Sequence, residues 1–192
     1  MSYSPTDIRK HFPLLSAGEN ASLHYLDNAA TTQVPQSVLD AMAAHDTTAR
    51  ANVKRGVHRL AERATQSFEA ARQTMADFVG TSDAREIVFT SGTTEAINLV
   101  AHALTPSLSA KDTLVFTALD HHSNIVPWHL AAQRSGAQTR AVGVTDQGRI
   151  DAAALEAALD NSVRIVALPH ISNVTGAVTD FATLVSLIRS KA

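Results

Sequence analysis

The chain has 192 residues, of which 45% are hydrophobic and 18% are charged, as is typical of a globular domain that can bury a core. Its 16 basic and 18 acidic residues give a net charge of -2 and form no basic run, so we expect neither nucleic acid nor a membrane surface as a partner. The absence of cysteine excludes a disulfide framework, a zinc knuckle and a cysteine nucleophile within these residues.

The amino-terminal segment is polar. It carries Asp7, Arg9 and Lys10 where a secretory signal peptide needs its apolar region, and no later apolar run approaches membrane-spanning length. We therefore expect a cytoplasmic protein. Ser4 is a suitable N-terminal cap, and it predicts a short helix over 5–12.

Short runs rich in β-branched residues alternate with segments that are each long enough for one helix. In chain order we expect helices over 36–50 and 60–79, a strand over 86–89, a helix over 94–104, a strand over 113–116, a helix over 125–134, a strand over 140–144, a helix over 151–159, a strand over 163–168 and a helix over 181–189. Gly80 is the expected left-handed residue after the longest helix.

This alternation predicts an α/β fold, in which a mostly parallel sheet is covered by helices on both faces to give three layers, α/β/α. No repeat, low-complexity tract or linker interrupts the sequence, so we expect a single domain over 1–192.

Ligands of open parallel sheets bind beyond the carboxyl ends of the strands, so the residues that follow each strand are candidate site residues. After the strand over 86–89, Gly92 precedes Thr93 and Thr94 at the start of a helix. A turn glycine, two hydroxyl groups and unpaired amide groups predict an anion-binding cradle. The alternative is that Thr93 or Thr94 only caps the helix.

Histidines follow the strand over 113–116. The His121 imidazole can lie flat on an aromatic cofactor, or it can form a structural pair with His122. We expect no metal site from His121, His122 and His129, because adjacent residues on an extended chain point in opposite directions and the helical His-Glu-x-x-His spacing is absent.

A polar turn follows the strand over 163–168. Asn173 in this turn can donate an amide hydrogen bond to a ligand, or it can hold the turn itself.

Five blocks in order along the chain resemble the class V aminotransferase family, and most of all the SufS/CsdA-type cysteine desulfurases and selenocysteine lyases. The blocks are YLDNAATT at 25–32, RGVH at 55–58, SGTTEAIN at 91–98, HHSNIVPW at 121–128 and ISNVTG at 171–176. The resemblance implies the large domain of the pyridoxal-phosphate (PLP) dependent transferase fold type I, with residues 1–20 as an arm or small-domain segment.

The resemblance also implies roles for individual residues. Thr93 and Thr94 are expected to bind the PLP phosphate, His121 to stack on the pyridine ring and assist proton transfer, and Asn173 to hydrogen-bond the phenolic oxygen of the ring. Ala29, Ala30, Arg55 and His58 are expected on the substrate side. Lys54 departs from the subgroup, which commonly has histidine there.

The activity implied is that of a cysteine desulfurase, which converts L-cysteine to L-alanine and passes the sulfur, as an enzyme persulfide, toward iron–sulfur cluster assembly. The implied partners are L-cysteine or L-selenocysteine, a sulfur-acceptor protein and a second copy in a homodimer.

The Schiff-base lysine, the aspartate for the pyridine nitrogen and the nucleophilic cysteine of the family have no counterpart here, since Lys10, Lys54, Lys111 and Lys191 lie in other contexts. We therefore expect a truncated amino-terminal segment that is inactive alone. The alternatives are a non-catalytic PLP-binding or dimerising protein, and another class V enzyme such as an aminotransferase or a selenocysteine lyase.

Overall fold

The computed structural model describes residues 4–191, and the chain divides into two compact units, Met1–Val88 and Phe89–Ala192. Composition gave no sign of this boundary, because no Pro-rich or Gly-rich linker separates the two units. That residues 1–192 form one partial domain of the complete family fold stays a prediction.

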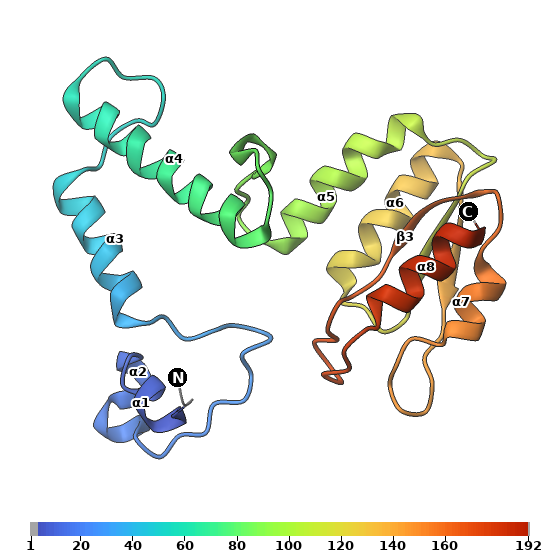
Figure 1. The fold of residues 1–192 in the computed structure, drawn as a ribbon, viewed down its shortest axis with the longest axis horizontal. Helices are drawn as coiled ribbons and strands as arrows, with labels where there is room; N and C mark the ends of the chain where they lie inside the picture. Colours follow the sequence, from blue (N-terminus) through green and yellow to red (C-terminus); the bar gives the residue numbers. More distant parts are fainter. Residues whose placement is uncertain (1–3, 192) are drawn as a thin grey trace. The chain divides into compact units, whose positions relative to one another are not determined.

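The described part of the first unit is helical (Figure 1). Its elements are α1 (Pro5–Arg9), α2 (Pro13–Ser16), the 3-10 helix η1 (Gly18–Asn20), α3 (Gln36–Thr48), α4 (Arg59–Val79) and the 3-10 helix η2 (Ala84–Glu86). The predicted cap of α1 is confirmed, since the Ser4 hydroxyl accepts a hydrogen bond from the Asp7 amide at 3.3 Å. The helix ends earlier than predicted, because Pro13 disfavours helical backbone in the residue before it and begins α2 instead.

The long helix α4 starts one residue before the predicted start and ends where predicted, at Val79. Ala61, Ala64 and Ala76 are its buried residues. Gly80 follows it in the left-handed conformation (φ 83°) and donates its amide to the Ala76 carbonyl at 2.9 Å.

The strand predicted over 86–89 is wrong. Asp83 accepts the Arg85 amide at 2.9 Å and starts η2 there, and residues 87–90 form no helix or strand. A β-branched run becomes a strand only beside another strand, and no described segment pairs with this one.

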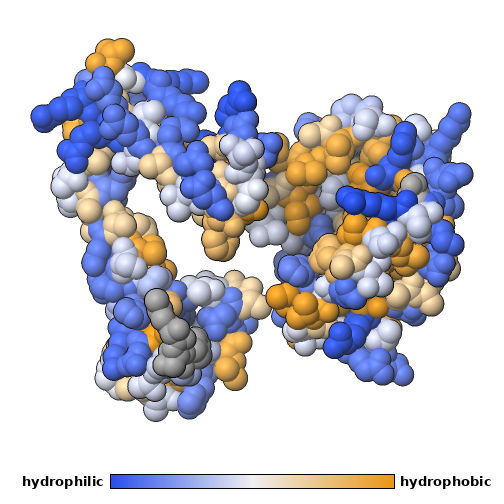
Figure 2. Space-filling view, viewed as in Figure 1, coloured by the Kyte–Doolittle hydropathy of each residue, from blue (hydrophilic) through white to orange (hydrophobic). Residues whose placement is uncertain are grey.

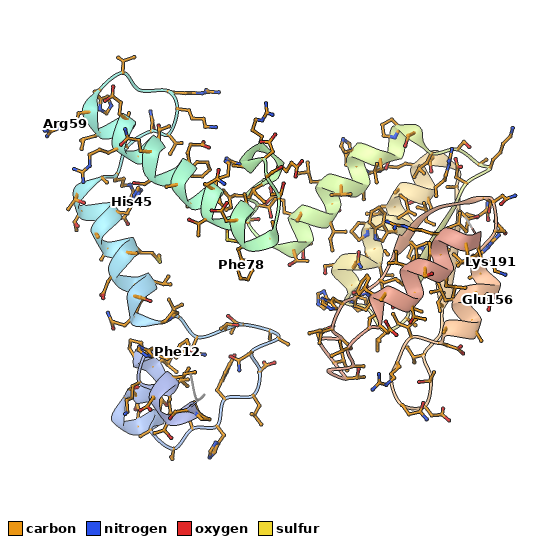
Figure 3. The ribbon with its side chains drawn as sticks, in the orientation of Figure 1. Phe12, His45, Arg59, Phe78, Glu156 and Lys191 are labelled. Carbon is orange, nitrogen blue, oxygen red and sulfur yellow. The ribbon has the colours of Figure 1, made fainter. Side chains whose placement is uncertain are left out.

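Apolar side chains are exposed on the first unit, as the orange areas over α3 and α4 in Figure 2 show. The described helix α3 buries none of its residues. Phe78 is 83% exposed and projects from the last turn of α4 (Figure 3), and Leu26 and Val57 are also almost fully accessible to solvent. Helices of this kind gain little stability from packing within their own unit.

The second unit holds the sheet. Its elements are α5 (Thr93–Leu104), the 3-10 helix η3 (Thr105–Ser107), β1 (Thr113–Thr117), the 3-10 helix η4 (His122–Asn124), α6 (Val126–Ser135), β2 (Gln138–Val142), α7 (Ala152–Ala158), β3 (Val163–Ala167) and α8 (Phe181–Lys191). The described strands are parallel, in the order β2-β1-β3, as predicted.

Helices cover both faces of this sheet, which confirms the three layers (Figure 1). On one face Leu114 and Phe116 of β1 pack with Trp128 and Ala131 of α6. On the other face Val115 and Val142 pack with residues of α7 and α8, among them Leu155 and Leu184. Successive side chains of β1 point to opposite faces of the sheet, so β1 contributes to the core on each face, as expected for a central parallel strand.

An ion pair ties the two helices on the second face together. The Lys191 ammonium of α8 lies 3.0 Å from the Glu156 carboxylate of α7 (Figure 3). Both side chains are about half exposed, so this contact contributes little to stability.

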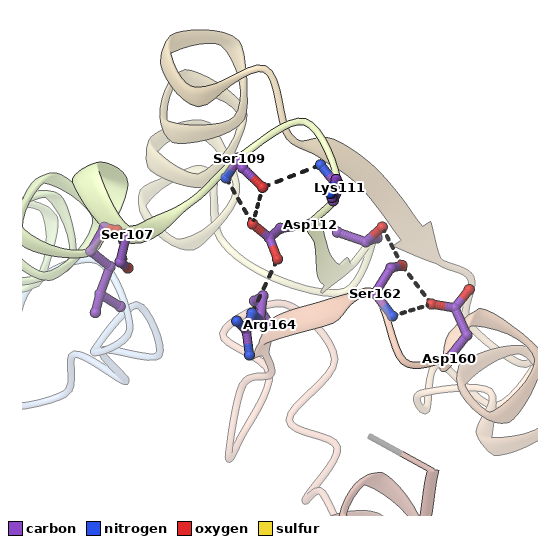
Figure 4. Close-up of polar contacts among 9 residues, drawn as sticks. Ser107, Ser109, Lys111, Asp112, Asp160, Ser162 and Arg164 are labelled. Carbon is purple, nitrogen blue, oxygen red and sulfur yellow. Dashed lines mark hydrogen bonds and ion pairs between the residues drawn. The ribbon is translucent and has the colours of Figure 1, made fainter.

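Polar side chains join the amino ends of β1 and β3 (Figure 4). Asp112 accepts hydrogen bonds from the Ser109 amide at 2.7 Å and the Ser109 hydroxyl at 2.8 Å, and from Arg164 Nε at 3.1 Å. The hydroxyl groups of Thr113 and Ser162 lie 2.8 Å apart. Side-chain hydrogen bonds therefore stabilise the amino ends of β1 and β3 in addition to the backbone hydrogen bonds between the strands.

Asp160 gives the second unit an acid-sensitive contact. Hydrogen bonds from Ser162, together with the Arg140 guanidinium, lower the pKa of Asp160 from 3.8 to about 2. A carboxyl group with a lowered pKa stabilises the fold above its unfolded pKa, and this stabilisation is lost as the pH falls through the folded pKa. We therefore expect Asp160→Asn to lower the melting temperature at pH 7, and the difference from the wild type to shrink as the pH falls from 3.8 to about 2.

Circular dichroism melts across that pH range measure the effect of Asp160→Asn. Asp146→Asn is the matched control, because Asp146 is exposed and its carboxylate has no hydrogen-bond partner among the described residues. Equal melting temperatures of the Asp160→Asn variant and the wild type at pH 7 would contradict this account.

Candidate functional site

The start of α5 offers unpaired amide groups to an anion. Gly92 is the N-cap residue and no side chain caps the helix, so Thr93 and Thr94 do not cap α5. Glu95 instead accepts the amide and the hydroxyl of Ser91, both at 2.6 Å, and these bonds lower the pKa of Glu95. The first amide groups of a helix have no partner within it, so those of Thr93 and Thr94 remain available.

His121 follows β1 at its carboxyl end and is exposed. Its Nδ1 accepts the Ser123 amide at 3.1 Å, and the Ser123 hydroxyl lies 2.9 Å from the same atom. A ring nitrogen that accepts a backbone N–H carries no proton itself, so the tautomer that fits these contacts has its proton on Nε2. The imidazole is therefore fixed as a donor through Nε2.

Thr94 and His121 line one pocket of about 280 Å³, although they lie far apart in the sequence. They come together because η4, which follows His121, packs on α5. The other residues that line the pocket are Asn98, His122, Ser123, Val126 and Pro127. The pocket thus combines a helix start, an imidazole and apolar walls.

Sequence reasoning missed Asn98 as a pocket residue. It lies one helical turn beyond Thr94, and its side-chain amide donates to the Thr94 carbonyl at 2.8 Å. The spacing of four residues on a helix is the signal that could have identified it.

His122 also lines this pocket, and its ring centroid is 6.2 Å from that of His121. The prediction that the two side chains point in opposite directions is wrong, because the chain leaves the extended conformation and enters η4 at His122. His129 packs against Phe116 instead, with ring centroids 4.7 Å apart. No three His, Cys, Asp or Glu side chains gather as metal ligands within residues 4–191.

Asn173 lies in the turn after β3 and does not line the pocket. The buried Ser172 holds this turn, since its hydroxyl accepts the amides of Val174 at 3.2 Å and Thr175 at 3.1 Å. The Asn173 side chain has no hydrogen bond to any described residue, so it does not hold the turn.

The four predicted substrate-side residues belong to the first unit. Ala29 and Ala30 are exposed in a turn, which the Tyr25 hydroxyl holds by donating to the Thr31 carbonyl at 2.9 Å. The turn therefore has its own support within the unit.

His58 and Arg55 lie in the exposed loop before α4. His58 is the N-cap residue of α4, and its Nδ1 accepts the Ala61 amide at 3.4 Å. A Cβ atom at Gly56 would overlap with Ala61, so the loop approaches α4 as closely as glycine allows. The capping role of His58 was missed, because histidine is not among the preferred N-cap residues.

Lys54 anchors the same loop. It adopts a positive φ of 67°, which is uncommon for a residue other than glycine. Its amide donates to the Thr65 hydroxyl at 2.8 Å, and its ammonium lies 2.8 Å from the Glu69 carboxylate. Lys54, the residue that departs from the subgroup pattern, thus attaches this loop to α4, and Arg55 lies in the same loop.

The comparisons with known proteins agree with this fold. Residues 24–192 match the family model of class V aminotransferases. The chain is 40% identical over 188 residues to a cysteine desulfurase of Pectobacterium carotovorum, which covers 97% of this chain and 46% of that protein. A probable cysteine desulfurase of Streptomyces coelicolor is 43% identical over 176 residues, which cover 88% of this chain and 42% of that protein.

Solved structures give the same result. The apo structure of a cysteine desulfurase from Thermococcus onnurineus matches with a TM-score of 0.88 and 34% identity, over 100% of this chain and 46% of that chain. The Escherichia coli cysteine desulfurase CsdA matches with a TM-score of 0.83 and 34% identity, over 99% of this chain and 47% of that chain.

The chain belongs to the class V aminotransferase family. Its sequence and structure are similar to cysteine desulfurases of the CsdA type, and its fold is that of the PLP-dependent transferases of fold type I. The chain spans about half the length of the curated relatives it matches. Within residues 4–191, no helix is long and apolar enough to cross a membrane.

Proposed function

We propose that this chain forms the cofactor-binding part of a PLP-dependent cysteine desulfurase. The observation that carries the proposal is the meeting of Thr94 and His121 in one pocket. The unpaired amides and the hydroxyl at the start of α5 suit a phosphate group, and an imidazole with apolar neighbours suits a flat aromatic ring. The volume of about 280 Å³ lies just below the usual range for ligand-binding pockets, roughly 300–1,000 Å³.

PLP, when bound, acts as an electron sink for the bonds at the substrate Cα atom. In this proposal Thr93 and Thr94 bind its phosphate, His121 faces the ring and Asn173 donates its side-chain amide to the phenolic oxygen. His121, with Nδ1 occupied by the Ser123 amide, can offer a proton for transfer through Nε2. Ala29, Ala30, Arg55 and His58 lie on the substrate side.

The substrate proposed for the complete activity is L-cysteine, with L-selenocysteine as the alternative. The sulfur passes to an acceptor protein and toward iron–sulfur cluster assembly, and the active protein is a cytoplasmic homodimer. These proposals rest on the similarity to cysteine desulfurases at about 40% identity.

Titration of the purified chain with PLP tests the proposal. The single tryptophan, Trp128, directly follows the pocket residues Val126 and Pro127 in α6, so its fluorescence reports binding nearby. We expect saturable quenching that inorganic phosphate competes away. Quenching that rises linearly with PLP would contradict the proposal.

The phosphate assignment predicts a loss on Thr94→Val, which removes the hydroxyl and keeps the side-chain shape. A hydrogen bond to a charged group contributes roughly 1.5–3 kcal/mol, so we expect PLP to bind at least roughly ten-fold more weakly. Thr74→Val is the matched control, since Thr74 is exposed on α4 and bonds only to its own helix. Equal PLP dissociation constants for Thr94→Val and the wild type would remove Thr94 from the site.

We expect these 192 residues alone to release no sulfur from L-cysteine, because they contain no cysteine to accept it. An alanine assay with the PLP-loaded chain measures this. Alanine formation above that of free PLP would contradict this expectation.

A further inference from the structure

Three side chains behind His121 form one chain of hydrogen bonds. The Trp128 indole Nε1 donates to Asn124 Oδ1 at 3.0 Å, and Asn124 Nδ2 donates to Asp120 Oδ2 at 2.6 Å. The other carboxylate oxygen of Asp120 accepts the His121 amide at 2.9 Å. The chain of bonds therefore begins in the core, where Trp128 is 6% exposed, and ends on the backbone of His121.

The donor and acceptor of each hydrogen bond in this series follow from the buried Trp128 indole. An indole N–H can only donate, so Asn124 must turn its oxygen to Trp128 and its amino group to Asp120. Asp120 can then only accept on that side, and it accepts the His121 amide with its other oxygen. An ionised carboxylate, which accepts on both oxygens, is the group that completes the chain.

The chain of bonds also closes the turn that holds the imidazole. Asp120 lies before η4 and Asn124 at its end, and their side chains are joined across it. The backbone N–H of Asn124 also donates to the His121 carbonyl at 2.8 Å. Ser123, whose amide fixes Nδ1 of His121, lies inside this closed turn. Partial burial raises the pKa of Asp120, while the bonds from Asn124 and His121 act in the opposite direction.

We propose that Asp120, Asn124 and Trp128 are positioning residues, which hold the His121 ring at the pocket in the single form with its proton on Nε2. This inference rests on the proposed function for its purpose, because that form presents an N–H at the surface of the pocket. The hydrogen-bond chain itself is a property of the protein without cofactor.

The test measures the imidazole nitrogen resonances of His121 by NMR in the cofactor-free chain, labelled with 15N-histidine and assigned with His121→Gln. We expect the wild type to show one acceptor nitrogen at Nδ1 and one protonated nitrogen at Nε2. Asn124→Ala should give averaged resonances of both tautomers, since it removes the side-chain bonds to Asp120 and Trp128 and leaves only the backbone bond across the turn. Asn161→Ala is the control, because Asn161 is exposed in the turn before β3, at the opposite end of the strands.

A pair of conservative variants tests the direction of the bonds. Asp120→Asn places a new amino group opposite the amino group of Asn124, and the two groups cannot hydrogen-bond to each other. We therefore expect the tautomer of His121 to change. Adding Trp128→Phe frees Asn124 to turn over and accept from the new amide at position 120. The double variant should therefore lie closer to the wild type than Asp120→Asn does. Trp128→Phe alone keeps a buried ring, and it should fold even where Asn124→Ala does not.

A single unchanged tautomer in Asn124→Ala and Asp120→Asn, or strictly additive shifts in the double variant, would overturn the inference. PLP titrations by absorbance on the same proteins separate it from the proposed function, and Asn124→Ala should weaken PLP binding roughly five-fold. Failure of the wild type to bind PLP would refute the proposed function and leave the tautomer result standing. Changed tautomers with unchanged PLP affinity would show that these residues hold the ring but would refute a role of that tautomer in PLP binding.

Discussion

Replacing Leu114 with alanine is expected to lower the free energy of unfolding of the second unit by about 2–5 kcal/mol. Leu114 is 0% exposed and lies in β1, the middle strand of the sheet. It packs on the α6 side together with Phe116 and Trp128. Removal of its side chain leaves a cavity that helices on a rigid sheet cannot fill.

Urea unfolding followed by Trp128 fluorescence measures the effect of Leu114→Ala, because the single tryptophan lies in the same core cluster and reports on this unit alone. Val174→Ala is the control, since Val174 is 81% exposed and its substitution should change the free energy by no more than about 0.5 kcal/mol. Similar losses in both variants would show that this face of the sheet is not a packed core.

Replacing His121 with alanine is expected to weaken PLP binding roughly ten-fold. A ring stacked on an aromatic partner contributes about 0.5–1.5 kcal/mol beyond its buried area, and the variant loses both. His121→Phe should recover most of the affinity, because it restores a flat ring but has no N–H group. Absorbance titration with PLP provides the dissociation constants.

His45→Ala is the control for a histidine loss, since His45 is exposed on α3 (Figure 3). If His121→Ala binds PLP as tightly as the control, the ring-stacking assignment fails. If His121→Phe is no better than His121→Ala, the contribution of His121 is a hydrogen bond and not stacking.

The layered architecture could be predicted because its strands are buried on both faces and their β-branched runs are distinctive. The run over 86–89 has the same composition, and it failed as a strand because composition does not tell whether a partner strand is present. The start of β2 was placed two residues late, since Gln138 and Thr139 are polar, yet they pair with the first residues of β1. Strand pairing depends on two segments, so the composition of one run does not show whether or where it pairs.

Part of the site could also be predicted, because the ends of parallel strands and the starts of helices have fixed places in this fold. Thr94 and His121 were found in this way. Ser123 and Pro127 were not, since they line the pocket through the local path of η4 and α6, and no pattern in the sequence indicates that path. The roles of Thr93, Thr94, His121, Asn173 and the four substrate-side residues stay predictions.

The two ends of the central strands carry different tasks. Asp112 and its partners hold the amino end of β1, and the pocket with His121 follows its carboxyl end. Substitutions at sites this far apart usually have additive effects. Substitutions that raise stability at low pH can therefore be made at the amino end, and substitutions that change ligand preference at the carboxyl end. The length of β1 keeps their effects independent.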